Sequence, residues 1–448
     1  MIDCGQPLGR TMYDTLIYNG QVITLDSQSR MLSAGAVAIS RGVIEKVWTP
    51  SPEAPLPAAR QTLDAGGGLI MPGLVNTHTH LPMSLFRGLA VDLPLDKWLH
   101  EHIFPAEAQH VSPRSVAIGT RLSVAEMLLS GTTTCCDGYF LASQVAEVVQ
   151  MSGMRAVLGQ GVIDYPAPGV PDPARNVTHA KTYAQEWLNR TPLLHPSIFC
   201  HSPYTCSTDT LVAAKQAANE LGVLFQIHVA ETQLETQQCR KTHGCSPIRY
   251  LEQIGILDEK TLLVHAVWVD ANDIRIIAAH KASVAHCPES NMKLAAGVAP
   301  VPDYLAEGIA VGLGTDGCAS NNDLDLLGEM DTAAKLHKVN RCDPTVMDAE
   351  TVLRMATIEG ARAIGLGDVI GSLEAGKQAD LIILDLGRPH LAPLYHPVSQ
   401  LVYAARGADI RHVMVAGRWL VQERRLLTMD LASLLEEVRQ IGRAIGAI

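Results

Sequence analysis

The chain is 448 residues long, which suits one large α/β barrel with an appendage or two mid-sized domains. Hydrophobic residues make up 47% of it and charged residues 18%, a balance that excludes a disordered or fibrous chain. Its 46 acidic and 35 basic residues leave a net charge of −11. This charge argues against a nucleic-acid or anionic-membrane partner, because phosphate binding needs a basic surface.

Features of exported or membrane-bound proteins are not expected either. No apolar run in the sequence approaches the roughly 18 residues of a spanning helix, and residues 1–10 lack the basic and apolar pattern of a secretory signal. Ten cysteines at irregular spacing suggest neither a disulfide scaffold nor a CxxC zinc pair. We therefore expect a cytoplasmic protein with reduced thiols.

Short strands are predicted near both ends of the chain. The N-terminal candidates cover 15–18, 21–24, 36–39 and 43–47, with breaks at Asn19-Gly20 and Arg41-Gly42. Asn-Gly between apolar runs is a strong hairpin signal. The tail from about 372 also contains short apolar runs broken by turn residues, with strand candidates at 379–384, 410–415 and 418–421. We expect residues 1–67 and 372–448 to form one small β-sandwich domain from both termini.

Residues 68–371 alternate short apolar runs with helical stretches. Helices are predicted from Ser112-Pro113 to Gly131 and from Ser207 to Gly222, on capping and periodicity. Eight apolar runs end near His80, Asp137, Asp164, His201, His228, His265, His286 and Asp316. Eight β/α units over about 300 residues predict a TIM-type (β/α)8 barrel. The competing fold, a doubly wound sheet, is expected to have a phosphate-binding glycine loop. No GxGxxG or Walker sequence opens a helix here, which favours the barrel.

Histidine and aspartate side chains fall at the ends of these runs. His78 and His80 end the first, His228 the fifth, His265 the sixth and Asp316 the eighth. In a parallel barrel these ends share one rim, and an i, i+2 pair on a strand points the same way. Three His and one Asp suit Zn²⁺ best, with iron or manganese possible. Strand four has no lysine to bridge a second ion, so we expect one metal.

Glu231 follows His228 by three residues and would lie close to the metal yet free of it. A carboxylate there can carry a proton from metal-bound water to a ring nitrogen. His265 and Asp316 would orient the bound hydroxide, and Asp316 could also take its proton. Glu231 could equally be a solvated acid at a helix start. These patterns predict a metal-dependent hydrolase and go no further.

Several motifs resemble those of a known family. Residues 71–80, Met-Pro-Gly-Leu-Val-Asn-Thr-His-Thr-His, resemble the amidohydrolase superfamily. Further segments are similar to the 5-methylthioadenosine/S-adenosylhomocysteine deaminases, namely 87–99, 104–107, 201–205, 286–294 and 314–323. The resemblance covers nearly the whole chain, including the split β domain.

This resemblance implies a ligand set, a substrate site and a reaction. The implied metal ligands are His78, His80, His228 and Asp316. The implied substrate-binding residues are Glu107, His201, Glu231 and Asp316, where Glu107 suits a ribose because a carboxylate can accept from two vicinal hydroxyls. Hydroxide would add to C6 of an adenosine derivative, Glu231 would protonate N1, and ammonia would leave an inosine analogue. Relatives are commonly homo-oligomers, which we expect here as well.

One position departs from some relatives, which carry arginine at the end of the third strand. Here Gln160 is neutral, and Arg175 lies in a proline-rich loop. We therefore expect a preference for 5-methylthioadenosine over S-adenosylhomocysteine, with adenosine also possible. Leu81, Met83 and Leu85 are candidates to line a thioether pocket or are plain packing residues.

Two other functions remain open at this stage. A related hydrolase could act on a free aromatic ring such as guanine, a pterin or a chloro-triazine, which would not need Glu107 and His201. A barrel that has lost catalysis could serve as a scaffold, but that function predicts gaps in the ligand set.

Overall fold

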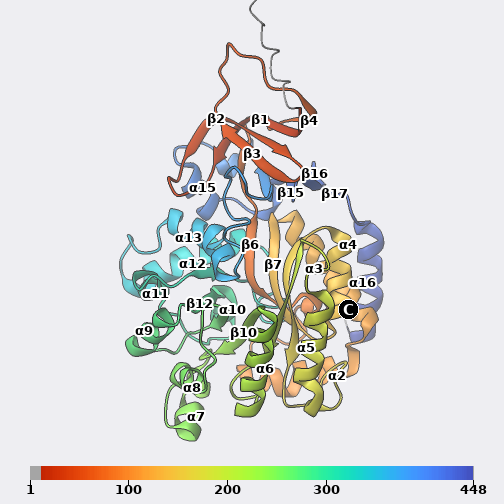
Figure 1. The fold of residues 1–448 in the computed structure, drawn as a ribbon, viewed down its shortest axis with the longest axis vertical. Helices are drawn as coiled ribbons and strands as arrows, with labels where there is room; N and C mark the ends of the chain where they lie inside the picture. The colour runs from red at the N-terminus through yellow and green to blue at the C-terminus, as the bar shows by residue number, and fades with distance from the viewer. Residues whose placement is uncertain (1–11, 447–448) are drawn as a thin grey trace, which may run out of the picture.

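The computed structural model describes residues 12–446 and contains two sheets (Figure 1). The first is a parallel sheet of eight strands in the order β13-β12-β11-β10-β9-β8-β7-β6. Its strands are β6 (Leu74–Thr79), β7 (Thr132–Tyr139), β8 (Arg155–Val162), β9 (Leu194–Cys200), β10 (Leu224–Val229), β11 (Thr261–His265), β12 (Ser283–His286) and β13 (Val311–Leu313). Each predicted apolar run contains one of these strands, and the predicted barrel is confirmed.

Helices and short turns connect the barrel strands. They are η1 (Leu81–Phe86), α1 (Leu95–Lys97), η2 (Trp98–Ile103), α2 (Phe104–His110), α3 (Pro113–Leu129), α4 (Ala142–Ser152), η3 (Pro173–Arg175), α5 (Asn176–Trp187), α6 (Thr208–Leu221), α7 (Gln233–His243), α8 (Pro247–Gln253), α9 (Ala271–Ala279), α10 (Pro288–Lys293), α11 (Val301–Ala306), α12 (Leu326–Arg341), α13 (Ala349–Met355) and α14 (Ile358–Ala363). None of the helices within 12–446 is both long and apolar enough to cross a bilayer.

The two predicted helices begin and end at the expected residues. The Ser112 hydroxyl accepts from the backbone N–H of Ser115 in a capping box, and α3 ends just before Gly131. The Ser207 hydroxyl accepts from Thr210, and α6 ends at Gly222, whose φ of +69° is the left-handed conformation of a glycine C-cap. Local capping chemistry therefore sets these boundaries.

The first and last barrel strands meet along a seam closed largely by side chains. The Asn76 amide donates to the Thr315 hydroxyl at 2.7 Å, and the Thr77 hydroxyl donates to the carbonyl of Leu313 at 2.9 Å. The backbone N–H of Asp316 donates to the carbonyl of His78 at 3.0 Å. These bonds place the end of β6 beside the residue that follows β13.

Strands from both ends of the chain form a second, mixed sheet, which lies at the top of Figure 1. They are β1 (Tyr13–Ile23), β2 (Met31–Ser40), β3 (Val43–Trp48), β4 (Ala59–Asp64), β5 (Leu69–Pro72), β14 (Leu381–Leu384), β15 (Ile410–Val415), β16 (Arg418–Gln422) and β17 (Arg425–Leu426). This confirms a β domain built from both termini. The division into 1–67 plus 372–448 and 68–371 stays a prediction, and β5, inside the second range, pairs in the mixed sheet.

Two local expectations were wrong. Asn19-Gly20 is not a hairpin, because β1 continues through it with a register shift against β2. A Cβ on Gly20 would lie 2.6 Å from Ile70. Glycine is therefore needed here for the close approach of the Ile70 side chain, and the chain does not reverse direction. Residues 69–80 are also not one strand. Gly73 separates β5 from β6 where a Cβ would lie 2.1 Å from Thr133, and there the chain passes from one sheet to the other.

A buried ion pair and a terminal helix join the two sheets' domains. Arg155, at the start of β8, donates from Nε and one terminal amine to Asp380 at 2.7 and 3.1 Å, and both side chains are 2% exposed. Helices α15 (Pro397–Tyr403) and α16 (Leu431–Ile445) complete the chain. Leu434 of α16 packs on Ile118 of α3, along the barrel's side in Figure 1. The nine cysteines within the described residues are free thiols.

Candidate active site

Four side chains from three parts of the barrel converge at the carboxyl ends of its strands. His78 comes from β6, His80 directly follows that strand, His228 comes from β10, and Asp316 follows β13. One donor atom from each lies within 4.8 Å of every other. Asp316 Oδ1 is 3.4 Å from His78 Nε2 and 3.3 Å from His80 Nε2, while His228 Nε2 is 3.0 Å from His78 Nε2. The residues that sequence placed at separate strand ends are therefore neighbours.

The protonation state of this cluster suits cation binding. Burial lowers the pKa of His78 to about 4 and that of His228 well below its usual value. Burial alone would raise the pKa of the Asp316 carboxyl, but the neighbouring imidazoles of His78 and His80 hold it well below the usual range. Neutral imidazoles beside an ionised carboxylate are the forms that ligate metals.

The spacing and orientation of the donors also fit a metal ion. Four ligands about 2.0–2.1 Å from a tetrahedral zinc ion lie roughly 3.3 Å from one another, close to the separations found here. His80 Nδ1 lies 2.6 Å from the carbonyl of Gly138, so the ring donates there and turns the Nε2 lone pair toward the cluster. Nε2 of His78 and Nε2 of His228 lie 3.0 Å apart, and a cation between them could be bound by both lone pairs.

Asp316 is fixed by hydrogen bonds to both of its carboxylate oxygens. Oδ2 accepts from the hydroxyls of Ser290 and Ser320, each at 2.7 Å, and Oδ1 accepts from the backbone N–H of Gly317 at 2.8 Å. The backbone of Asp316 is itself left-handed, with a φ of +60°. Strained backbone of this kind gathers at functional sites.

Glu231 and His265 face one another beside the cluster. His265 Nε2 is 3.9 Å from Glu231 Oε2. His265 Nδ1 is 3.0 Å from the Asn291 amide oxygen, which accepts its proton and leaves Nε2 as an acceptor. Burial, with the nearby charge of Asp316, raises the pKa of Glu231 to about 8. A carboxyl in this state can hold a proton at neutral pH and release it to a basic atom.

Glu107, on α2, lines the same pocket as Glu231 and His265. Its Oε1 accepts from the Tyr139 hydroxyl at 2.5 Å. Burial raises the pKa of Glu107 to about 7, against the opposing effect of that hydrogen bond. His201 also lines the cavity. Burial lowers its pKa to about 3, and its Nδ1 is 2.9 Å from the Thr205 hydroxyl, so a neutral imidazole presents Nε2.

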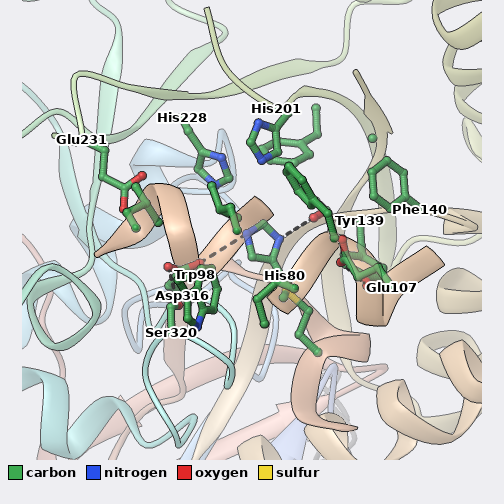
Figure 2. A pocket seen from close by; sticks show the side chains of 18 of the residues that line it. His80, Trp98, Glu107, Tyr139, Phe140, His201, His228, Glu231, Asp316 and Ser320 are labelled. Carbon is green, nitrogen blue, oxygen red and sulfur yellow. Dashed lines mark hydrogen bonds and ion pairs between the residues drawn. The ribbon is translucent and has the colours of Figure 1, made fainter. Parts of the chain in front are cut away.

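One pocket, with about 730 Å³ of empty space including its open mouth, is lined by His80, Glu107, His201, His228, Glu231, His265 and Asp316, whereas the buried His78 does not line it. In Figure 2, Glu231 and Glu107 lie on opposite sides, with His80 and His228 between them. The remaining wall is largely apolar and comes from the segment after β6 and from strand ends; it includes Met83, Leu95, Trp98, Leu99, Ile103, Phe104, Tyr139, Phe140, Val162 and Phe199. Such a cavity suits a flat ring with a few polar edges.

The structure separates the candidate thioether-pocket residues from one another and adds lining residues to which the sequence assigned no role. Met83 lines the cavity, but Leu81 and Leu85 do not. Gln160 points away from it, because its amide oxygen accepts from the backbone of Ala142 and its nitrogen donates to the carbonyl of Gly161. Trp98, Tyr139 and Ser320 are the main additions. Trp98 and Ser320 fall within the family-like segments 87–99 and 314–323, and Tyr139 ends β7, but the sequence assigned none of them a role.

Comparisons with known proteins agree with this arrangement. The sequence model of the Amidohydrolase family matches residues 69–420. The chain belongs to the amidohydrolase family. This amidohydrolase is 47% identical over 438 residues to a 5-methylthioadenosine/S-adenosylhomocysteine deaminase of Syntrophobacter fumaroxidans, covering 98% of this chain and all of the relative. It is 40% identical to a 5'-deoxyadenosine deaminase of Methanosarcina mazei, covering 97% of this chain and 99% of the relative.

A solved structure extends the likeness to the whole fold of this amidohydrolase. An adenosine deaminase of Xanthomonas campestris, with bound zinc, superposes with a TM-score of 0.94 at 39% identity. The match covers 97% of this chain and 98% of that one. The predicted resemblance to the amidohydrolase superfamily and its 5-methylthioadenosine/S-adenosylhomocysteine deaminase branch is confirmed.

Proposed function

We propose that this amidohydrolase is a metal-dependent hydrolytic deaminase of adenosine-type nucleosides, with 5-methylthioadenosine as a preferred substrate. One observation carries the proposal: a protonatable carboxyl, Glu231, and a second carboxyl, Glu107, lie on opposite sides of one cavity that also holds the His/Asp cluster. A purine at the cluster with its ribose toward Glu107 would use both of these carboxyls and the cluster together.

We assign the metal to His78, His80, His228 and Asp316. When bound, the ion acidifies water and supplies a nucleophile at neutral pH. Zinc is the proposed metal because the donors are three imidazoles and one carboxylate, and the Xanthomonas relative was solved with zinc. Iron and manganese are the alternatives that metal analysis would distinguish.

The chain's own residues would move the protons. Glu231 holds a proton near neutral pH and delivers it to N1 of the purine as water adds to C6, and the proton that this water loses on attack replaces it on Glu231. Asp316 accepts the remaining proton of the added oxygen and passes it to the 6-amino group. The C6–N bond then breaks, a C6 carbonyl forms, and ammonia leaves. His265, through its unprotonated Nε2, orients the attacking water from the side opposite Asn291.

The other residues would bind the nucleoside. Oε1 of Glu107 is held by Tyr139, and the carboxylate can accept from two vicinal ribose hydroxyls. His201 Nε2 is available to the purine or the sugar from the opposite wall. The alternative, a hydrolase of a free guanine, pterin or chloro-triazine ring, would leave the buried Glu107 bound to Tyr139 but without a substrate group to bind.

A second hollow continues past Glu107 and suits the 5′ substituent. Phe104, Glu107 and Phe140 line both spaces. Beyond them its wall, within the described residues, carries no lysine or arginine; besides His100 and Tyr165 it consists mainly of Val111, Ile163, Pro166, Pro168 and Pro171. Arg175 is exposed and lines neither space. An uncharged thioether tail would be accepted there, whereas the amino-acid end of S-adenosylhomocysteine would lack an ion-pair partner.

The test is an ultraviolet deamination screen over adenosine, 5-methylthioadenosine, S-adenosylhomocysteine and free bases, with and without chelator. We expect chelator-sensitive ammonia release from the nucleosides and the highest kcat/KM for 5-methylthioadenosine. Turnover of free bases alone would establish the ring-hydrolase alternative, and no turnover with full metal content would favour a scaffold. A higher kcat/KM for S-adenosylhomocysteine would overturn the substrate preference alone. A cytoplasmic location and a homo-oligomer also remain predictions.

A further inference from the structure

Glu235 lies in the first turn of α7, outside the catalytic cavity, and its buried side chain is 5% exposed. Thr232-x-x-Glu235 has the sequence of a capping box, in which the glutamate would bind the backbone N–H of the N-cap threonine. Half of the motif is present, because the Thr232 hydroxyl accepts from the backbone N–H of Glu235 at 3.2 Å. The carboxylate of Glu235, however, reaches past Thr232.

Both oxygens of this carboxylate bind the main chain just after β10. Oε1 accepts from the backbone N–H of Ala230 at 2.7 Å, and Oε2 accepts from the backbone N–H of Glu231 at 2.8 Å. The Glu235 side chain therefore holds the backbone of Glu231 directly, through the peptide N–H of Glu231. An ordinary capping residue would stabilise the helix start without this contact.

The backbone at this point is strained and is held from two sides. Ala230 has a φ of +51°, in the left-handed region that alanine rarely adopts. Its carbonyl accepts from the backbone N–H groups of Val267 at 3.0 Å and Trp268 at 2.8 Å, after β11. With Glu235 on the opposite side, these bonds fix a turn after which the Glu231 carboxylate lies 3.9 Å from His265.

We propose that Glu235 is a positioning residue that aims Glu231 at the substrate. The inference rests on the proposed acid/base role of Glu231. A misplacement of about 1 Å in a catalytic group can cost roughly a hundredfold in rate. The role needs a carboxylate, because two N–H donors require two acceptor oxygens. A glutamine has one acceptor and would turn its NH₂ group against a backbone N–H.

The first test is Glu235→Gln, which conserves size and removes one acceptor. For the metal-loaded, folded protein we expect kcat to fall about 10–100-fold, with KM within about twofold and metal content per chain unchanged. Glu259→Gln makes the same chemical change at an exposed position and should leave kcat and KM as they are. Wild-type kcat in metal-loaded Glu235→Gln would overturn the inference.

A double variant separates positioning from a general structural role. If Glu235 acts through Glu231, then Glu231→Gln/Glu235→Gln should have the same residual kcat as Glu231→Gln alone. Losses that multiply would instead show that Glu235 acts independently, against the inference. Wild-type kcat in Glu231→Gln would refute the acid/base assignment itself, whatever Glu235→Gln does.

Poor folding of Glu235→Gln is covered by a second substitution. Glu235→Asp keeps both acceptors on a shorter side chain and should lower kcat less than the amide does. Its kcat, KM and metal content per chain are measured in the same way. If a variant folds, binds metal and has wild-type kcat, the proposal is contradicted.

Discussion

Tyr139 donates its hydroxyl to Glu107 at 2.5 Å and so ties the end of β7 to α2. The two residues are 32 positions apart, and both are nearly fully buried. Because α2 follows the irregular stretch from η1 to η2, this bond fixes a carboxylate that its own helix places only approximately. The proposed ribose contact therefore depends on a residue that would not itself need to touch the reacting ring.

Tyr139→Phe removes this bond and should weaken nucleoside binding. A hydrogen bond to a charged group contributes about 1.5–3 kcal/mol, so KM for adenosine or 5-methylthioadenosine should rise about 10–100-fold, with kcat changed far less. Steady-state kinetics check this, with 2′,3′-dideoxyadenosine as the matched substrate. An equal rise in KM for the dideoxy compound would show that Tyr139 does not act through the ribose hydroxyls.

The pH dependence of kcat/KM for nucleosides should follow the ionisation of Glu107. Burial raises its pKa to about 7, so it is largely protonated below that pH and loses an acceptor for the ribose hydroxyls. Between pH 8 and pH 6 the ionised fraction falls about tenfold for a pKa near 7, and kcat/KM should fall by up to that factor. In Glu107→Gln this acid limb should vanish while kcat/KM is low throughout. An unchanged limb in the variant would assign the pH dependence to another group.

Loss of the metal should remove activity and lower stability together. Metal activation of water lowers the barrier by several kcal/mol. His228→Ala should therefore lose at least about 10³-fold in kcat/KM and most of its bound metal. A ligand at 1,000 times its Kd stabilises the folded state by about 4 kcal/mol, so chelator should lower Tm of the wild type but not of His228→Ala. His179→Ala, an exposed histidine on α5, is the control for metal content.

The buried pair of Arg155 and Asp380 should matter for stability and not for catalysis. Asp380→Asn leaves the Arg155 guanidinium buried beside a neutral amide, and breaking such a pair costs about 3–5 kcal/mol. Denaturant unfolding should show that loss, with kcat of the folded enzyme unchanged. Glu436→Gln, in an exposed pair with Arg439, should change the free energy of unfolding by less than about 1 kcal/mol. A similar effect of both substitutions would contradict the role given to burial.

The barrel and its cluster could be predicted because both depend on local patterns. Each strand is a short apolar run, and the barrel rule then brings His78, His228 and Asp316 to one rim without any knowledge of long-range contacts. The helix ends at Ser112 and Gly222 follow from capping chemistry alone. These are features that a few neighbouring residues determine.

Other features depend on contacts between distant residues and were missed. Asn19-Gly20 has a hairpin sequence, but the close approach of Ile70 makes it a bulge. Tyr139 looks like a core aromatic until Glu107 lies beside it. Glu235 fits a capping box, and only the path of the chain at Ala230 shows that its carboxylate binds elsewhere. Periodicity and composition carry no information on such partners.

The seam between β6 and β13 has a consequence for the barrel as a mechanical unit. His78 and His80 lie on one side of it and Asp316 on the other, so an ion bound by all three would cross-link the first strand to the eighth. Without that cross-link, opening should begin at this seam. Amide hydrogen exchange in 74–79 and 311–313 should therefore quicken together in the chelated protein, before it does in the barrel strands that carry no metal ligand.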